Sequence, residues 1–149
     1  MTIEIPTIER PLPVIDEDSR PFWEATARHE LRIQRCRDCG QHVFFPRLVC
    51  NHCYRMSLEW VEVTGTGTVH SFTIVRRAPH PAFEAKVPYV VALVDLAEGP
   101  RLLTTVETSD VDDVRIGQPV RVRFEDIAEG ITLPTFEPVP AQDGPTPNE

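Results

Sequence analysis

The four cysteines of this 149-residue sequence form two C-x-x-C pairs, Cys36 with Cys39 and Cys50 with Cys53. A C-x-x-C turn aims both sulfurs at one point, and two facing turns make a cage of four thiolates for a tetrahedral metal ion. The spacing therefore predicts a metal site with these four cysteines as ligands and a hairpin between the pairs. We expect the ion to be structural, because four cysteine ligands leave no position for a catalytic water.

Zinc is the metal that the sequence favours. Disulfides are disfavoured in a reducing cytosol, and two C-x-x-C pairs so close together do not fit a thioredoxin-like redox site. Iron is the alternative, in a rubredoxin-like electron carrier, because four thiolates suit iron as well as zinc. Gly40 stands after the first pair as in rubredoxin-like knuckles, but Tyr54 stands after the second. His42 and His52 lie close to the pairs, and we expect them to be surface groups because no cysteine is missing.

Motifs of a self-sufficient enzyme are absent from the sequence. It contains no G-x-S-x-G, no phosphate-binding glycine loop and no G-x-G-x-x-G. His70 and His80 are the candidate bases; we expect His70 to be packed or on the surface, and His80 to project from a proline-framed loop. Asp110, Asp112 and Asp113 are explained equally well as a metal cluster or as a solvated acidic loop. We therefore expect no catalytic residues in this chain.

Short elements must position the cysteine pairs. Residues 20–30 follow Asp18 and Ser19 and carry a proline in the first turn, a pattern typical of a capped helix start. Residues 31–35 alternate between apolar and polar, which predicts a strand with one solvent-facing side that runs into the first pair. Residues 43–45 supply a return strand between the two pairs.

The rest of the chain predicts a small β-barrel. Beyond a β-prone start at residues 58–63, the expected strands are residues 69–77, 89–96, 101–107, 120–125 and 131–139. Five β segments with a connection between the third and fourth fit a closed OB-type barrel better than a sandwich, which uses about seven strands. The predicted fold is mainly β: an N-terminal helix, a rubredoxin-like zinc ribbon and a five-stranded OB-fold barrel.

We expect four regions along the chain: an arm and short helix (1–30), the zinc ribbon (31–60), the barrel (61–139) and a disordered acidic tail (140–149). The arm carries six aliphatic residues, which favours docking onto a surface, including that of a partner. No apolar run approaches the roughly 20 residues of a membrane span. The amino terminus also lacks the layout of a signal peptide, so the expected location is cytoplasmic.

The net charge of −8 is distributed unevenly. Residues 28–55 hold six arginines against two acidic residues, whereas residues 95–149 hold twelve acidic residues against four arginines. An acidic chain argues against a general nucleic-acid binder. A single-stranded nucleic-acid module is still the alternative function, because the ribbon is locally basic and Phe72, Tyr89 and Phe124 are available for stacking bases.

Taken together, these segments resemble the DUF35 family of zinc-ribbon/OB-fold proteins. The segments that carry the resemblance are Arg20-Pro21-Phe22-Trp23, Leu31-Arg32-Ile33-Gln34-Arg35-Cys36, Cys39-Gly40, Phe45-Pro46-Arg47 before Cys50, and Gly65-Thr66-Gly67-Thr68-Val69. The resemblance covers about residues 18–139. The chain departs from the family pattern at Tyr54, in the arm and in the acidic tail.

The resemblance implies a non-catalytic accessory subunit in a hetero-oligomer with an acyl-CoA enzyme. Family members accompany thiolase-like proteins, including archaeal HMG-CoA synthase complexes and aryl ketone-forming thiolases, and also aldolases and hydratases of steroid side-chain breakdown. There the barrel is expected to accommodate the CoA arm or to bridge subunits. Arginines anchor phosphates well, so Arg47, Arg76 and Arg77 are the candidate CoA-binding residues, with residues 78–87 covering the arm.

Overall fold

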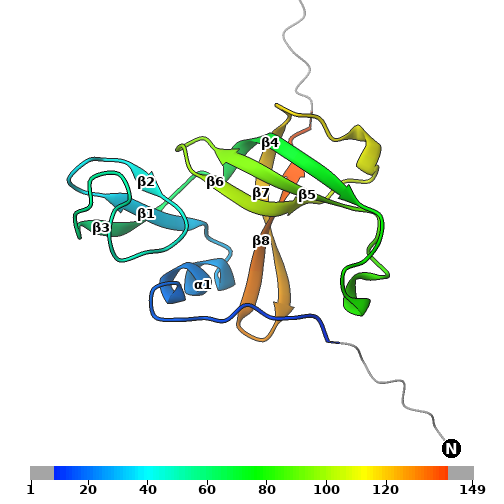
Figure 1. Cartoon of the computed structure of the whole chain (residues 1–149), viewed down its shortest axis with the longest axis horizontal. Helices are drawn as coiled ribbons and strands as arrows, with labels where there is room; N and C mark the ends of the chain where they lie inside the picture. The colour runs from blue at the N-terminus through cyan, green and yellow to red at the C-terminus, as the bar shows by residue number, and fades with distance from the viewer. Residues whose placement is uncertain (1–8, 141–149) are drawn as a thin grey trace, which may run out of the picture.

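The computed structural model describes residues 9–140 of the chain, in which a small sheet and a barrel lie side by side (Figure 1). In chain order the elements are α1 (Arg20–Ala27), β1 (Arg32–Cys36), β2 (His42–Val43), β3 (Leu58–Glu62), β4 (Thr66–Val75), η1 (Pro81–Phe83), β5 (Tyr89–Leu96), β6 (Arg101–Val106), η2 (Val111–Asp113), β7 (Pro119–Ala128) and β8 (Ile131–Pro138). The predicted mainly β fold, with one N-terminal helix, a ribbon and a barrel, is confirmed.

The ribbon is a three-stranded antiparallel sheet in the order β2-β1-β3. The central strand β1 pairs along its whole length with β3, from Arg32 opposite Glu62 to Cys36 opposite Leu58. Its pairing with β2 covers only two residues. The prediction of a solvent-facing side on β1 is wrong at Gln34, which is buried because its side-chain amide bonds to the loop after β2.

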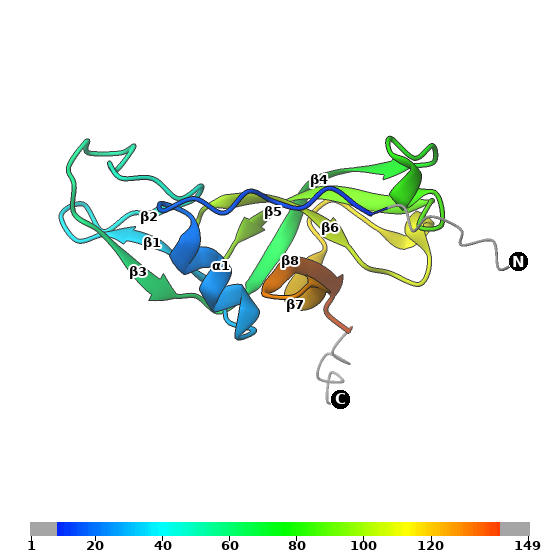
Figure 2. The same cartoon turned by 90° about the horizontal axis from the view of Figure 1, so that it is seen from below.

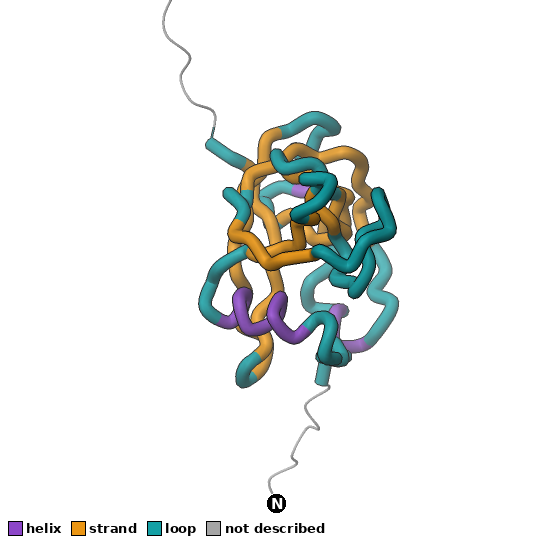
Figure 3. The backbone as a smooth tube through the Cα atoms, turned by 90° about the vertical axis from the view of Figure 1, so that its left-hand side faces the viewer, coloured by secondary structure: helices purple, strands orange, loops and turns teal. Residues whose placement is uncertain are grey.

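The barrel has five strands in the closed order β4-β5-β6-β8-β7. The strands are drawn in orange in Figure 3. Most neighbours are antiparallel and share long registers, for example eight residue pairs between β4 and β5. The exception is the parallel contact of β6 with β8, where Val106 opposite Phe136 is the one pair in register. This seam leaves the two strands held together mainly by side chains.

Two glycines let the first barrel strand approach its neighbours closely. A Cβ atom on Gly67 would lie 2.5 Å from the backbone oxygen of Asp95, and one on Gly65 would lie 2.3 Å from Cγ1 of Val122. Gly65 also has a φ of +76°, a conformation that L-residues rarely adopt. The G-x-G at the start of the barrel is therefore a packing requirement of the fold.

Helix α1 connects the ribbon to the barrel. Phe22 of α1 and Ile33 of β1 belong to the same buried cluster as Phe136 of β8, so ribbon and barrel share one hydrophobic core. The helix ends at Ala27, earlier than predicted, because His29 takes a left-handed φ of 60°. The His29 ring then stacks on Phe124 of β7 with ring centroids 5.3 Å apart.

The helix start differs from the sequence prediction. Ser19 makes no side-chain capping bond to the helix, and its hydroxyl instead donates to Oδ1 of Asp16. Asp16 Oδ1 also accepts from the backbone N–H of Ser19 at 2.8 Å, which makes Asp16 the capping side chain of the preceding turn. These bonds to Ser19 lower the pKa of Asp16.

The described part of the arm runs back along the barrel toward η1 (Figure 2). The guanidinium of Arg10 lies over the ring of Phe83, 5.2 Å from its centroid. Leu12 and Val14 stay exposed. Residues 1–8, and the tail beyond residue 140, lie outside the described residues. Within residues 9–140 no helix has the length and apolar character needed to cross a membrane.

Candidate metal centre and its surroundings

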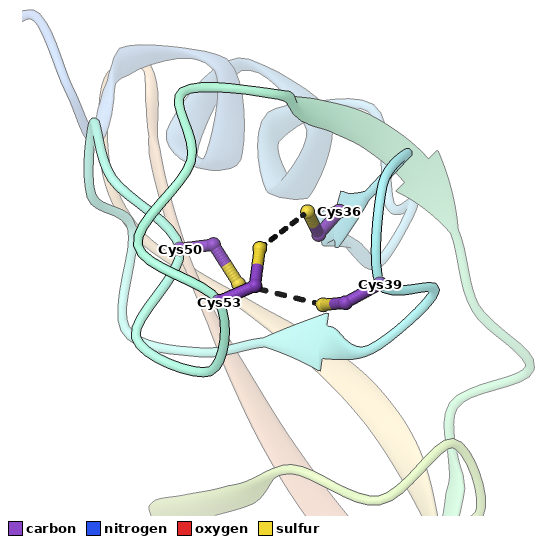
Figure 4. Close-up of side chains that lie close together, drawn as sticks. All are labelled: Cys36, Cys39, Cys50 and Cys53. Atoms are coloured by element: carbon purple, nitrogen blue, oxygen red, sulfur yellow. Dashed lines mark hydrogen bonds between the residues drawn. The ribbon is translucent and has the colours of Figure 1, made fainter.

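The four predicted metal ligands converge at one point of the ribbon (Figure 4). Their sulfur atoms all lie within 4.8 Å of one another. Cys36 Sγ lies 3.6 Å from Cys53 Sγ, and Cys39 Sγ lies 3.7 Å from Cys50 Sγ. Cys36 and Cys50 are fully buried, whereas Cys39 is exposed. The structure thus brings together the two pairs that the spacing predicted.

The two knuckles have the same local backbone geometry. The N–H of Gly40 donates to the Cys36 carbonyl at 2.8 Å, and the N–H of Tyr54 donates to the Cys50 carbonyl at 3.0 Å. Gly40 has a φ of 76° and Tyr54 a φ of 63°. The departure at Tyr54 therefore changes the side chain but not the fold of the second knuckle. The knuckle needs a left-handed backbone conformation at this position, and glycine adopts that conformation without strain.

The sulfur positions fit a tetrahedral ion of the size of zinc. Four sulfurs at the usual zinc–sulfur distance of about 2.3 Å lie about 3.8 Å apart, close to the two spacings given above. Such an ion would hold the end of β1 and the first knuckle to the second knuckle, and with four thiolates it would supply no open position for a substrate. Its contribution is to folding.

Four thiolates at this site would need a cation between them. Burial disfavours the Cys50 thiolate, but the backbone N–H groups of Cys53 and His52 that point at its sulfur lower its pKa to about 7. At Cys53 the N–H of Arg55 favours the thiolate, yet burial and the neighbouring Cys36 thiol raise the pKa to about 12. Four ionised sulfurs at these spacings are therefore stable only around a positive ion.

The histidines do not extend this centre. His52 is exposed and His42 is half-buried, and neither joins the group of sulfurs within the described residues. His70 lies on the barrel surface, 3.3 Å from Asp95 and 3.1 Å from Arg101. His80 begins η1, where its Nδ1 accepts from the N–H of Ala82 at 3.1 Å. Each has a structural contact that accounts for its position.

The acidic residues before β7 form a capped turn. Asp110 Oδ1 accepts from the N–H of Asp112 at 2.9 Å at the start of η2. Asp112 also lies 3.4 Å from Arg76. The interpretation of these residues as a solvated loop therefore fits the structure better than a metal cluster.

The three candidate CoA-binding arginines do not come together. Arg47 lies in the ribbon, where its Nε donates to the carbonyl of Phe45 at 3.2 Å. Arg76 and Arg77 follow β4, whose far end lies at the opposite end of the molecule from the ribbon (Figures 1 and 2). All three are exposed. One phosphate group cannot contact all of them within a single chain.

Sequence analysis missed an apolar surface beside the metal centre, which we call the ribbon patch. It consists of large hydrophobic side chains exposed on the loops of the ribbon: Phe45, Leu48, Val49, Tyr54 and Met56. Tyr54 is 80% exposed. Apolar residues gathered on one short, metal-held loop are typical of a protein-binding surface. The hydrophobic residues between the cysteine pairs were the feature of the sequence that could have indicated this patch.

Comparison with known proteins defines the class. Residues 23–59 match a family model described as the ChsH2 rubredoxin-like zinc ribbon domain, and residues 60–125 match the ChsH2 C-terminal OB-fold domain. The predicted structural zinc and OB-fold barrel are thereby confirmed, and the chain is a zinc-ribbon/OB-fold protein.

A DUF35 domain-containing scaffold protein of Methanothermobacter thermautotrophicus is 34% identical over 118 residues, which cover 78% of this chain and 87% of that protein. This chain belongs to the DUF35 family, as the sequence resemblance indicated.

Two further relatives are parts of enzymes. A probable enoyl-CoA hydratase alpha subunit of Thermomonospora curvata is 39% identical over 142 residues, which cover 95% of this chain. The aligned part is 44% of that subunit, so the chain spans less than half of its length. The solved structure titled Ltp2-ChsH2(DUF35) aldolase superposes with a TM-score of 0.77 and 40% identity, covering 85% of this chain and 98% of the matched one.

Proposed function

We propose that this chain is a non-catalytic accessory subunit that binds a thiolase-like, aldolase or hydratase acyl-CoA enzyme in a hetero-oligomer. It stabilises that enzyme and helps to shape its acyl-CoA channel, and Cys36, Cys39, Cys50 and Cys53 hold a zinc ion that fixes the ribbon. The names of the hydratase and aldolase relatives support this assignment. So does the chemistry of the chain, whose metal site has no open coordination position.

The ribbon patch is the observation that carries the proposal. Its exposed side chains lie on the segments before Cys50 and after Cys53, which a zinc ion held by the four cysteines would fix, and the amide of Gln34 bonds to Arg47 in the first of these segments. A rigid loop loses little conformational entropy on binding, so its apolar side chains are well suited to an interface. Arg47 and Arg55 are exposed on the same loops and give the patch a basic rim, although Arg55 lies 3.8 Å from Asp38.

Contact with the CoA arm is part of the proposal. Arg76 and Arg77 are the candidates at the barrel end, next to the loop that holds η1, and Arg47 is the candidate at the ribbon end. Because these positions are far apart, we assign them to different phosphates or different CoA molecules of the complex. Arg76 must also exchange its contact with Asp112 for one with a phosphate.

The test is co-expression of the tagged full chain with the acyl-CoA enzyme encoded beside it, followed by size-exclusion chromatography. We expect a stable complex and a higher melting temperature for the enzyme within it. A variant with Leu48→Ser, Tyr54→Ser and Met56→Ser should bind at least about 100-fold more weakly, because the apolar centre of an interface carries most of its affinity.

The matched control is Ile116→Ser, which changes an exposed aliphatic residue on the barrel. It should bind as the unchanged chain does, and both variants should keep one zinc per chain. An enzyme that elutes apart from this chain, or a patch variant that binds normally, would refute the proposal. So would turnover of an acyl-CoA by the isolated chain.

The three rings named for the nucleic-acid alternative form no stacking platform within residues 9–140. Phe72 and Phe124 are half-buried against the core, and the face of Phe124 is covered by His29. Tyr89 packs toward Phe83, with ring centroids 6.2 Å apart. Stacking needs exposed ring faces along a groove, and these rings are engaged within the protein.

We also propose a cytoplasmic location. All four cysteines are free thiols positioned for a metal, which is the arrangement that a reducing compartment maintains.

A further inference from the structure

Strand β6 has one edge that is fully paired and one that is largely open. Its pairing with β5 spans the whole of β6. Among the described residues its one pair with β8 joins Val106 to Phe136, at the end of β6. The first half of β8 diverges from β6 (Figure 1). The two strands are bridged there by the hydroxyl of Thr104, which donates to the Pro134 carbonyl at 3.1 Å.

The hydrogen-bond pattern shows which backbone groups of β6 point to the open side. In an antiparallel ladder, each residue directs both its N–H and its C=O to the same side, and the side alternates along the strand. The N–H of Leu96 donates to the Pro100 carbonyl at 2.9 Å, so the even-numbered residues face β5. The N–H of Glu107 donates to a carbonyl of β8 at 2.7 Å, so the odd-numbered residues face the other side. Arg101 and Leu103 therefore direct four backbone groups to the open edge.

These four backbone groups have no hydrogen-bond partner within residues 9–140. Leu103 is 73% exposed, so the edge is open to solvent. Proteins commonly protect an open edge with a charge, a proline or a bulge. Leu103 provides none of these, and the charge of Arg101 is balanced by Asp95, whose Oδ1 accepts from Arg101 Nε at 2.7 Å. The edge is thus free to accept another strand.

The side chains beside this edge are apolar. Leu103 stands opposite Leu93 of β5, and its neighbour Leu102 is buried in the barrel, so Leu103 and Leu93 share the outer face. A residue paired with Leu103 from outside would place its side chain on the same face, where aliphatic neighbours stabilise a sheet. The edge therefore selects an extended segment with an aliphatic residue at that position.

The open edge is continuous with the ribbon patch. Leu103 and Phe45 line the same cavity between the barrel and the ribbon, and Phe45 is 61% exposed. Pairing of three residues alone buries far less than the roughly 1,200 Å² of a stable interface. The edge must therefore act together with the surface beside it, and that surface is the ribbon patch. This favours the enzyme bound at the patch over a second copy of this chain.

We propose that an extended segment of the partner enzyme adds as a strand to residues 101–103 of β6, with an aliphatic side chain beside Leu103. Main-chain hydrogen bonds to a strand edge provide affinity, and the neighbouring side chains provide specificity. The inference rests on the proposed function, and it adds a second contact, on the barrel, together with the secondary structure of the segment that makes it.

Amide hydrogen exchange of the full zinc-loaded chain tests the inference without any substitution. In the isolated chain the amides of Leu102 and Thr104, which face β5, should exchange slowly, and those of Arg101 and Leu103 should exchange fast. The chain is then exchanged in complex with the enzyme, and after quenching the exchange is read by NMR on the released chain. We expect the amides of Arg101 and Leu103 to exchange at least about tenfold more slowly in the complex.

Substitution of Leu103 separates its backbone from its side chain. Leu103→Pro removes an N–H that points away from β5, so the barrel keeps its own hydrogen bonds. Leu103→Ala, the matched control, removes most of the side chain and keeps the N–H. We expect the proline variant to bind the enzyme about tenfold more weakly than the alanine variant. Both should retain one zinc per chain and a cooperative thermal transition.

Unchanged exchange of Arg101 and Leu103 in a complex that does form would overturn the inference and leave the proposed function standing. Equal binding by a folded proline variant and the alanine variant would do the same. If the proline variant does not fold, the exchange result decides. Protection that grows with the concentration of the isolated chain would assign the edge to a second copy and also overturn the inference. Absence of any complex would refute the proposed function, and the inference with it.

Discussion

The side-chain amide of Gln34 bonds to both backbone groups of Arg47. Its Nε2 donates to the Arg47 carbonyl at 2.8 Å, and its Oε1 accepts from the Arg47 N–H at 2.8 Å. Gln34 is 6% exposed, so its two hydrogen bonds to the backbone of Arg47 are shielded from competing water. The side chain of Gln34 therefore fixes the loop after β2 to the sheet by hydrogen bonds, as a longer strand would. This is needed because β2 has only two residues.

Replacing Gln34 by alanine should destabilise the protein by about 1–2 kcal/mol, since it removes both side-chain hydrogen bonds to the backbone of Arg47. Urea unfolding at neutral pH measures the change, and amide hydrogen exchange should show faster exchange at Arg47. Arg35→Ala, the neighbouring exposed residue of β1, is the control and should change stability far less.

Replacing Cys50 by serine should abolish zinc binding and unfold the ribbon, because Cys50 is fully buried in the group of four sulfurs. Elemental analysis gives the zinc content, and the NMR spectrum reports the fold. His52→Ala, two residues further along the chain, should retain one zinc per chain. A folded, metal-free Cys50→Ser protein would contradict the structural role of the ion.

Gly67→Ala should destabilise the barrel by about 2–3 kcal/mol, because the added Cβ meets backbone at 2.5 Å and the strands must move apart. Gly130→Ala is a useful comparison. Its φ is +73° and nothing lies within 4 Å of the added Cβ, so only backbone strain of about 1 kcal/mol is expected. Thermal unfolding of the two variants separates the two effects, and equal losses would contradict this explanation.

The pKa of Asp95 lies below its ordinary value because Arg101 Nε donates to it at 2.7 Å. The carboxylate therefore stabilises the fold fully above its ordinary pKa, and that stabilisation is lost as the pH falls through the lowered pKa. Arg101→Gln should raise the pKa of Asp95 and lower the stability only slightly at neutral pH, since both side chains are partly exposed. A carbon-detected NMR titration measures the pKa; Arg121→Gln should leave it unchanged.

Spacing and periodicity were sufficient to predict the metal site and the order of the elements. Two C-x-x-C pairs dictate a local geometry, and the barrel strands repeat an apolar pattern that the folded sheet buries, as in β5, where every second residue is buried. These features are local, so one sequence reveals them.

Contacts between distant segments were not predictable in this way. Gln34 reads as a solvent-facing residue of β1 because its partner lies thirteen residues further along the chain. Asp16 replaces Ser19 as the capping residue because the chain makes an extra turn before α1. The cavity where the barrel meets the helix and the ribbon is lined by residues of α1, β5, β6, β8 and the loop after β2, and no pattern within any one of these segments indicates it.

The matched knuckles at Gly40 and Tyr54 bear on how the ribbon acquires its ion. Most backbone bonds that shape the knuckles are local, such as those from Cys36 to Gln41 and from Cys50 to Arg55, whereas the N–H of Arg37 bonds to the distant carbonyl of Ser57. Each knuckle is therefore organised mainly by residues close to it in sequence. The metal ion then joins two knuckles whose backbone is already shaped. When the metal binds, conformational entropy is therefore lost mainly by the ten residues between the two cysteine pairs. This is the segment that exposes Phe45 and Leu48 to solvent.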